Sequence, residues 1–322
     1  MNILRFVGRQ RHSKNERFYM IATAIKITYF QSAWAGFSKA AEKYGVTAEL
    51  RGPGGFDARA EATEFRTVVA LRPAGILVHV VNRAMMGPEI DAAIAAGIPV
   101  ITFDADAPAS HRLFFIGTNN RMAGLLGGKR VATKLNGKGN VVFFTIAGQL
   151  NLEERLKGYQ EAFDDYPGIN VVDVVDVFDM MGDASLAMHK AEEYLARTGP
   201  AKIDAMVCLE STSGMDVGEA FKRVGAKGTL LMGMDADVGT LKLVKDGTID
   251  ATIAQKPYTM AFLGLKALDE AYHYPVRPLG RGYRLDPFSP FPAFIDTGVT
   301  LVDKSNVDAV LKNESGTAGG SQ

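Results

Sequence analysis

The feature that most constrains the fold of this chain is an alternation of short apolar segments with amphipathic helical segments. In the amphipathic segments apolar residues recur at helical spacing, as Ala62, Phe65 and Val69 do, which indicates one buried helix face. The first series predicts strands at Arg17–Ala24, Thr47–Arg51, Gly75–Val80, Ile98–Phe103 and Phe114–Ile116. It predicts helices at Phe30–Tyr44, Ala58–Leu71, Glu89–Ala96 and Arg121–Leu135.

The same alternation then restarts. The second series predicts strands at Asn140–Ile146, Asn170–Val177, Ile203–Leu209, Thr229–Met232 and Asp250–Ala254. It predicts helices at Leu152–Asp165, Ala184–Arg197, Met215–Val224, Val238–Lys245 and Tyr258–Tyr272. The segment Pro275–Pro292 is rich in proline and aromatic residues and is expected to form a long ordered loop, followed by one more strand at Phe294–Leu301.

Continuous apolar strands that alternate with helices are typical of parallel sheets covered on both faces. Two such series in 322 residues predict an α/β fold with two doubly wound parallel-sheet lobes. In such sheets ligands bind beyond the carboxyl ends of the strands. The residues that directly follow each strand are therefore the candidates for function.

Composition excludes several classes of protein. Lys and Arg number 36 and Asp and Glu also number 36, so the chain has no basic field for nucleic acid. No run reaches the ~18 apolar residues of a membrane helix. The basic segment Met1–Arg17 lacks the apolar run of a secretory signal, so we expect either a cytosolic protein or a chain that begins after its true signal.

Motifs for catalysis, metals and cofactors are absent from the sequence. It contains no phosphate-binding loop and no nucleophile elbow, and its five histidines form no pair at metal-ligand spacing. The one cysteine, Cys208, lies in an apolar strand and is expected to be a small core residue. The sequence therefore predicts a protein that is not an enzyme and that holds neither cofactor nor metal.

In the first series, aromatic and charged residues follow the strands. Tyr29 and Phe30 come after the first strand, where their rings can stack on a sugar or pack in the helix core, and Lys26 can donate to a ligand or be solvated. Asp104 and Asp106 follow the strand Ile98–Phe103. A carboxylate there can accept two hydroxyl hydrogen bonds, or can cap a turn.

The second series offers a similar set. Arg155 lies in the first turns of a helix and presents a fork of donors, unless it is a surface arginine. Phe178 ends one strand and could form an aromatic wall, Asp235 ends another, and Gln255 can both donate and accept. Aromatic rings, carboxylates, an arginine and a glutamine are suited to a neutral polyhydroxylated ligand.

At this point the chain resembles the periplasmic sugar-binding proteins of ABC transporters, in the ribose-binding-like (type I) group. The resemblance runs from about Arg17 to Val310. The matching segments, in family order and spacing, are Tyr29–Gly45 (YFQSAWAGFSKAAEKYG), Gly97–Asp104 (GIPVITFD), Ile116–Gly124 (IGTNNRMAG), Glu154–Phe163 (ERLKGYQEAF), Met232–Asp235 (MGMD) and Ala251–Pro257 (ATIAQKP).

The resemblance implies two lobes that are joined by a hinge of three crossovers and close on a ligand. The expected boundaries are residues 1–16 for an N-terminal extension, 17–118 with 256–291 for the N-terminal lobe, 119–255 with 292–312 for the C-terminal lobe, and 313–322 for a disordered tail. The ligand-binding residues that it implies are Tyr29, Phe30, Asp104, Arg155, Phe178, Asp235 and Gln255.

The chain departs from the ribose-binding pattern at three strand ends. Ala105 stands where the family has arginine, and Val80 where it has asparagine. Glu210-Ser211-Thr212 replaces an asparagine-aspartate pair, and Ser211 is the binding candidate of that segment. The pair Asp104 and Asp106 resembles the autoinducer-2- and rhamnose-binding branch. Ribose is therefore not the expected ligand, and the expected class is a monosaccharide or similar polyol.

By this resemblance the chain is expected to be the monomeric solute-binding component of an importer, in the periplasm or anchored outside the membrane. Its partners would be the sugar and a membrane permease, and not nucleic acid. Two alternatives share the fold. One is a sugar-sensing partner of a chemoreceptor or kinase, and the other is a LacI-type effector domain without its DNA-binding headpiece.

Overall fold

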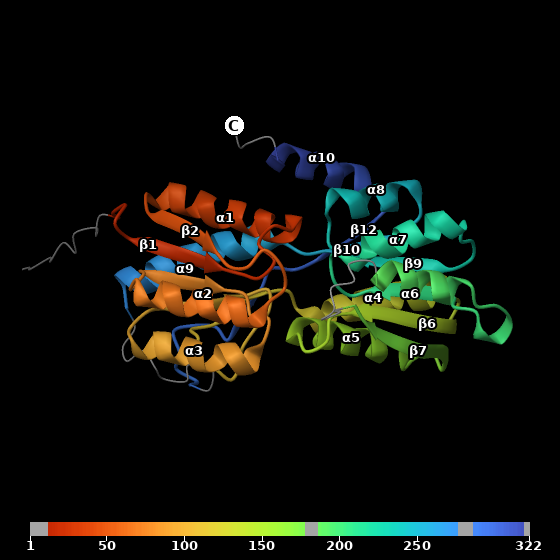
Figure 1. The fold of residues 1–322 in the computed structure, drawn as a ribbon, viewed down its shortest axis with the longest axis horizontal. Helices are drawn as coiled ribbons and strands as arrows, with labels where there is room; N and C mark the ends of the chain where they lie inside the picture. The colour runs from red at the N-terminus through yellow and green to blue at the C-terminus, as the bar shows by residue number, and fades with distance from the viewer. Residues whose placement is uncertain (1–11, 178–185, 276–285, 319–322) are drawn as a thin grey trace, which may run out of the picture. The chain divides into compact units, whose positions relative to one another are not determined.

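The computed structural model describes residues 12–177, 186–275 and 286–318 (Figure 1). The chain divides into two compact units. The first comprises Met1–Gly117 and Pro257–Ile295, and the second comprises Thr118–Lys256 and Asp296–Gln322. The chain therefore passes between the units three times. Each unit is a mostly parallel sheet with helices on both faces, which confirms the predicted fold class.

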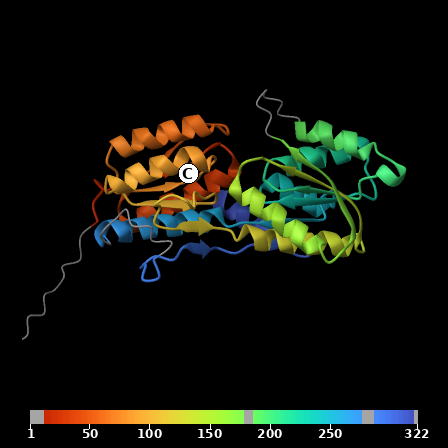
Figure 2. The ribbon, with the colours of Figure 1, turned by 90° about the horizontal axis from the view of Figure 1, so that it is seen from below.

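The first unit is built on a six-stranded sheet in the order β11-β5-β4-β3-β1-β2. Within this unit α1 packs against α9 and α2 packs against α3, and Figure 2 shows the second pair and α9 on opposite faces of the sheet. The elements are β1 (Arg17–Ile21), α1 (Thr28–Tyr44), β2 (Thr47–Arg51), α2 (Ala58–Ala70), β3 (Gly75–Val78), α3 (Arg83–Ala95), β4 (Val100–Phe103), β5 (Phe115–Gly117), α9 (Pro257–His273) and β11 (Phe294–Asp296).

The second unit repeats this plan with the strand order β12-β10-β9-β8-β6-β7, in which β12 runs antiparallel to β10. Helix α4 packs against α5, and α6 against α7. The elements are α4 (Asn120–Lys134), β6 (Lys138–Thr145), α5 (Leu150–Phe163), β7 (Gly168–Asp176), α6 (Leu186–Leu195), the 3-10 helix η1 (Gly199–Ala201), β8 (Ala205–Cys208), α7 (Ser213–Val224), β9 (Leu230–Met234), α8 (Val238–Asp246), β10 (Ala251–Ala254), β12 (Thr300–Asp303) and α10 (Val307–Ala318).

Burial explains why these segments are strands. Every residue of β3, β4, β8 and β10 is buried, because helices cover both faces of each sheet. Their apolar side chains supply the two cores, and Cys208 is one of the core residues of the second unit. Such burial is the main stabilising contribution, at about 25 cal/mol per Å² of apolar surface.

Glycines set the close packing of α4 on α5. A Cβ atom at Gly124 would lie 2.0 Å from the carbonyl oxygen of Arg155, and one at Gly158 would lie 2.1 Å from that of Arg121. No larger residue fits at either position without moving a helix. This contact holds α5, which carries Arg155, close against α4.

Two local predictions differ from the structure. The single strand expected at Phe294–Leu301 is two strands, β11 in the first sheet and β12 in the second, because Gly298 breaks the extended segment with a φ of 74°. Helix α3 begins at Arg83 and not at Glu89, because Asn82 caps it by accepting from two backbone amides. The expected loop at 275–292 lies partly outside the described residues.

The carboxyl-terminal segment also differs from its prediction. Helix α10 extends to Ala318, so it includes residues 313–318 of the segment expected to be disordered. Val307, Val310 and Leu311 pack on the core of the second unit and anchor the start of this helix. Helix formation is cooperative, so an anchored first turn carries the helix into the polar residues that follow.

Candidate functional site

Two aspartates occupy equivalent places in the two units. Asp104 follows β4, and Asp235 follows β9. Both have left-handed backbones, with φ of 60° and 68°, and each side chain is largely buried. Their amides donate in the same way to the next strand, Asp104 to the Ile116 carbonyl at 3.1 Å and Asp235 to that of Ile253 at 2.8 Å. Non-glycine residues pay a conformational cost here, and such costs concentrate at functional sites.

In the first unit a chain of polar contacts leads away from Asp104. The Tyr29 hydroxyl donates to Asp104 Oδ1 at 2.5 Å. The other carboxylate oxygen, Asp104 Oδ2, lies 3.3 Å from His79 Nε2. The second ring nitrogen, His79 Nδ1, lies 3.3 Å from Glu61 Oε1. Glu61 also accepts from the Val81 amide at 3.1 Å. The predicted residues Tyr29 and Asp104 are therefore brought together, and a buried histidine orients the aspartate.

His79 carries the positive charge of this cluster. Burial by itself lowers the pKa of His79, but the hydrogen bonds to Asp104 and Glu61 outweigh it and raise that pKa to about 9. At neutral pH the imidazolium donates to both carboxylates. With one cation between two anions, the cluster keeps a net negative charge, which favours a ligand that donates hydrogen bonds.

The other predicted residues of the first unit have different surroundings. Phe30 is buried, with its ring edge-on to those of Tyr29 and His79 at 5.3 and 5.0 Å, so it supports the cluster from the core side. Lys26 is exposed in the loop after β1, next to Gly54.

Asp106 is held by its own unit. It forms a two-point ion pair with Arg112, whose Nη2 lies 2.5 Å from Asp106 Oδ2, and it also accepts from the Thr102 hydroxyl at 2.6 Å. Arg112 is buried, so its carboxylate partner neutralises a buried charge. These contacts give Asp106 a role in fixing the loop after β4.

In the second unit Arg155 is fully buried, with 1% of its surface exposed. Its Nη1 donates to the Leu209 carbonyl, and its Nη2 donates to Asn120 Oδ1 at 2.5 Å. Its Nε has no hydrogen-bond partner among the described residues. The guanidinium thus joins the ends of two segments and retains one buried donor.

Asp235 and Gln255 are also brought together, since Gln255 Nε2 donates to Asp235 Oδ1 at 3.0 Å. Ser211 is half-buried just after β8. Its neighbour Glu210 caps α7 by accepting from the amide and hydroxyl of both Thr212 and Ser213. Phe178 lies outside the described residues.

Buried polar atoms without partners gather in the second unit. Seven of the eight such side-chain atoms in the described part of the chain belong to it. They are Thr118 Oγ1, Gln149 Nε2, Asn151 Oδ1, Arg155 Nε, Asp237 Oδ2, Thr240 Oγ1 and Gln255 Oε1. Each such atom costs about 1–3 kcal/mol if it stays unpaired. A polar ligand at the carboxyl edge of this sheet would offset that cost.

Several residues of these clusters are not among the predicted site residues. Gln149 lies in the loop between β6 and α5, and Asn151 lies in the first turn of α5, as Tyr29 and Phe30 lie in the first turn of α1, so position after the strand was a usable signal. His79 also follows its strand, yet a single histidine in an apolar segment is typical of a core. Its partner Glu61 lies on α2 and only the folded chain brings the two together.

Comparison with known proteins identifies the family to which this chain belongs. The periplasmic binding protein domain family matches residues 18–272, and the chain belongs to this family. A crystal structure of a sugar-binding protein of a sugar ABC transporter from Bacillus halodurans is 32% identical, with a TM-score of 0.78 over 92% of this chain and 100% of that one. The arabinose-binding protein AraP from Geobacillus stearothermophilus is also 32% identical, with a TM-score of 0.75 over 92% and 99%.

A more distant relative widens the range of ligands in the family. The xylitol-binding protein of Mycolicibacterium smegmatis is 24% identical over 261 residues, which cover 80% of this chain and 69% of that protein. In the described part of the chain, no helix combines the length and the apolar character needed to cross a membrane.

Proposed function

We propose that this chain is the solute-binding component of an ABC importer and that it binds a neutral monosaccharide or sugar alcohol. The observation that carries the proposal is the set of buried, unpartnered polar atoms near the strand ends of the second unit. It is supported by the two left-handed aspartates at equivalent positions. We propose that Asp104 and Asp235 both accept hydrogen bonds from hydroxyls of one ligand.

The chemistry of these groups favours a neutral polyol. A carboxylate has about four lone-pair positions, so Asp104 and Asp235 can accept from hydroxyls and keep their present partners. Arg155 Nε and Gln149 Nε2 can donate, and Gln255 Oε1 can accept. The net negative charge around Asp104 disfavours an acidic sugar, because a second anion there would be desolvated without a cationic partner.

Among neutral polyols, we propose pentoses and pentitols as the first candidates. The support comes from the relatives, since one is described as an arabinose-binding protein and another as a xylitol-binding protein. Arabinose and xylitol share a five-carbon chain with hydroxyls on neighbouring carbons. Adjacent hydroxyls are the groups that a carboxylate can bind in two-point fashion.

A ligand that contacts both units stabilises the arrangement of the units in which both contacts exist. Its binding therefore shifts the population toward that arrangement. The free energy of this shift cannot exceed the difference between the ligand's binding free energies for that arrangement and for the others. We propose that the liganded form then docks on a membrane permease, outside the cytoplasmic membrane. No step of this cycle requires bond chemistry in the protein.

The test is a thermal-denaturation panel of pentoses, pentitols, hexoses and uronic acids, each at about 1 mM. A ligand at a thousandfold excess over its Kd adds roughly 4 kcal/mol of stability, which raises Tm by several degrees. We expect at least one neutral sugar or sugar alcohol to do so, and the uronic acids to have no effect. A panel in which only acidic sugars stabilise the protein would contradict the proposal.

A further inference from the structure

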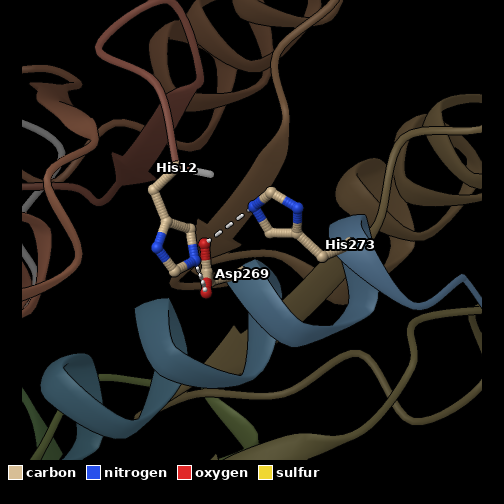
Figure 3. Close-up of side chains that lie close together, drawn as sticks. All are labelled: His12, Asp269 and His273. Atoms are coloured by element: carbon tan, nitrogen blue, oxygen red, sulfur yellow. Dashed lines mark hydrogen bonds and ion pairs between the residues drawn. The ribbon is translucent and has the colours of Figure 1, made fainter. Parts of the chain in front are cut away.

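A second cluster of chemically active side chains lies in the first unit, between the N-terminal segment and helix α9. Figure 3 shows His12 and His273 approaching Asp269 from two sides. Their nitrogen and oxygen ligand atoms all lie within 4.8 Å of one another. Asp269 and His273 are four residues apart on α9 and so share one helix face. None of the three belongs to the polar clusters around Asp104 and Asp235.

A second carboxylate lies beside the cluster and contacts His273. Glu16, at the end of the same N-terminal segment, places Oε2 3.1 Å from His273 Nε2. The other separations are 3.1 Å from His12 Nε2 to Asp269 Oδ2 and 3.5 Å from His273 Nε2 to Asp269 Oδ1. Donors bound to tetrahedral zinc at about 2.0–2.2 Å lie about 3.3–3.6 Å apart. The separations of 3.1 and 3.5 Å lie within about 0.2 Å of that range, and the ligand atoms of His12, Asp269 and His273 as a set lie within 4.8 Å of one another.

The Asp269 side chain is nine-tenths buried and aimed into the cluster. Its Oδ1 accepts no hydrogen bond from the described residues, although His273 Nε2 lies 3.5 Å away. A cation at this point would supply the partner that Oδ1 lacks.

We infer that His12, Asp269 and His273 form a binding site for a divalent transition metal of the zinc type, with the Glu16 carboxylate beside His273, and that this site ties the N-terminal segment to helix α9. Two neutral imidazoles and two carboxylates balance the charge of the dication. Mixed imidazole and carboxylate donors suit Zn²⁺ and Co²⁺ better than Mg²⁺ or Ca²⁺, which take oxygen ligands only.

The metal can reach the site from solvent. The His12 side chain is 35% exposed, and a surface hollow of about 310 Å³ is lined by Glu16 and by Tyr272, the neighbour of His273. The sequence did not reveal this site, because His12 and His273 are far apart in the sequence and only the fold of the first unit brings them together.

The experiment uses the full chain without an affinity tag, stripped with a chelator and then titrated calorimetrically with ZnCl₂. We expect one Zn²⁺ per chain. Co²⁺ should give the intense visible absorption of a tetrahedral complex, which an outer-sphere ion does not give. Zinc at a hundredfold excess over its Kd should raise Tm by roughly 5 °C or more.

Variants separate this site from other histidines. His12→Ala changes an exposed residue and should fold normally, yet it should weaken zinc binding roughly tenfold or more, as should His273→Ala. His111→Ala is the matched control, because His111 is also exposed in the first unit and lies 3.0 Å from an aspartate oxygen of Asp91. Wild-type protein that binds no zinc, or equal binding by the His12 and His111 variants, would overturn the inference.

Discussion

Stability should fall as pH rises from about 6.5 to 9, because the folded first unit holds a proton on His79. The pKa of this buried histidine is raised from 6.5 to about 9 by Glu61 and Asp104, against the opposing effect of burial. A folded-state pKa above the unfolded value gives stability that is fully present below pH 6.5. It is lost as pH rises through the folded pKa, since the folded state then gives up the proton.

The loss of unfolding free energy can be calculated from the rise in the pKa of His79. A rise from 6.5 to about 9 corresponds to about 3 kcal/mol of unfolding free energy across this interval. For a stability of 5–15 kcal/mol that is a large fraction. The single tryptophan, Trp34, packs against the core of the first unit, so its fluorescence reports on the unit that contains His79.

The assay is urea denaturation followed by Trp34 fluorescence at several pH values between 6 and 9.5. Wild-type protein should lose about 3 kcal/mol over this range. His79→Gln should be less stable at pH 6.5 and should show a much flatter dependence, while His111→Gln should follow the wild type. Equal slopes for wild type and His79→Gln would refute the assignment of the proton to His79.

Two further predictions concern packing and charge. Asp106→Asn should cost about 3–5 kcal/mol of unfolding free energy in the fluorescence assay, because it leaves the buried Arg112 without its carboxylate. Asp91→Asn, at a partly exposed carboxylate, should cost under about 1 kcal/mol, and equal costs for the Asp106 and Asp91 variants would contradict the burial argument. Gly124→Ala should lower Tm in circular dichroism by an amount equivalent to about 1–3 kcal/mol or more, since its Cβ would lie 2.0 Å from a carbonyl oxygen of α5. Gly55→Ala, which meets no atom within 4 Å, should leave Tm nearly unchanged.

The sequence predicted the fold well because the evidence for it is local. Continuous apolar segments and amphipathic segments can each be recognised in short windows of neighbouring residues, and their alternation predicts both parallel sheets. The break at Gly298 was missed because a single glycine in an apolar run changes the period too little to register. The start of α3 was missed because Asn82 acts through side-chain hydrogen bonds to the backbone.

The candidate site was predictable to the extent that it sits directly after strands. Asp104 and Asp235 could be located in this way, and their ligand contacts remain predictions. The cluster of His79 with Glu61 was not predictable, because it needs the packing of α2 on the sheet. Side chains from distant segments come into contact only in the folded chain, and such contacts cannot be inferred from a single sequence.

Calorimetric titration of the wild type, Asp104→Asn and Asp235→Asn with the best sugar from the thermal panel is the direct test that both aspartates bind the ligand. We expect each substitution to weaken binding by about 2–4 kcal/mol, roughly 30- to 1000-fold, because each carboxylate loses charge-assisted hydrogen bonds to the same ligand. Both variants should keep the wild-type circular dichroism spectrum. Loss of affinity in one variant alone, or in neither, would contradict the claim that both units bind one sugar.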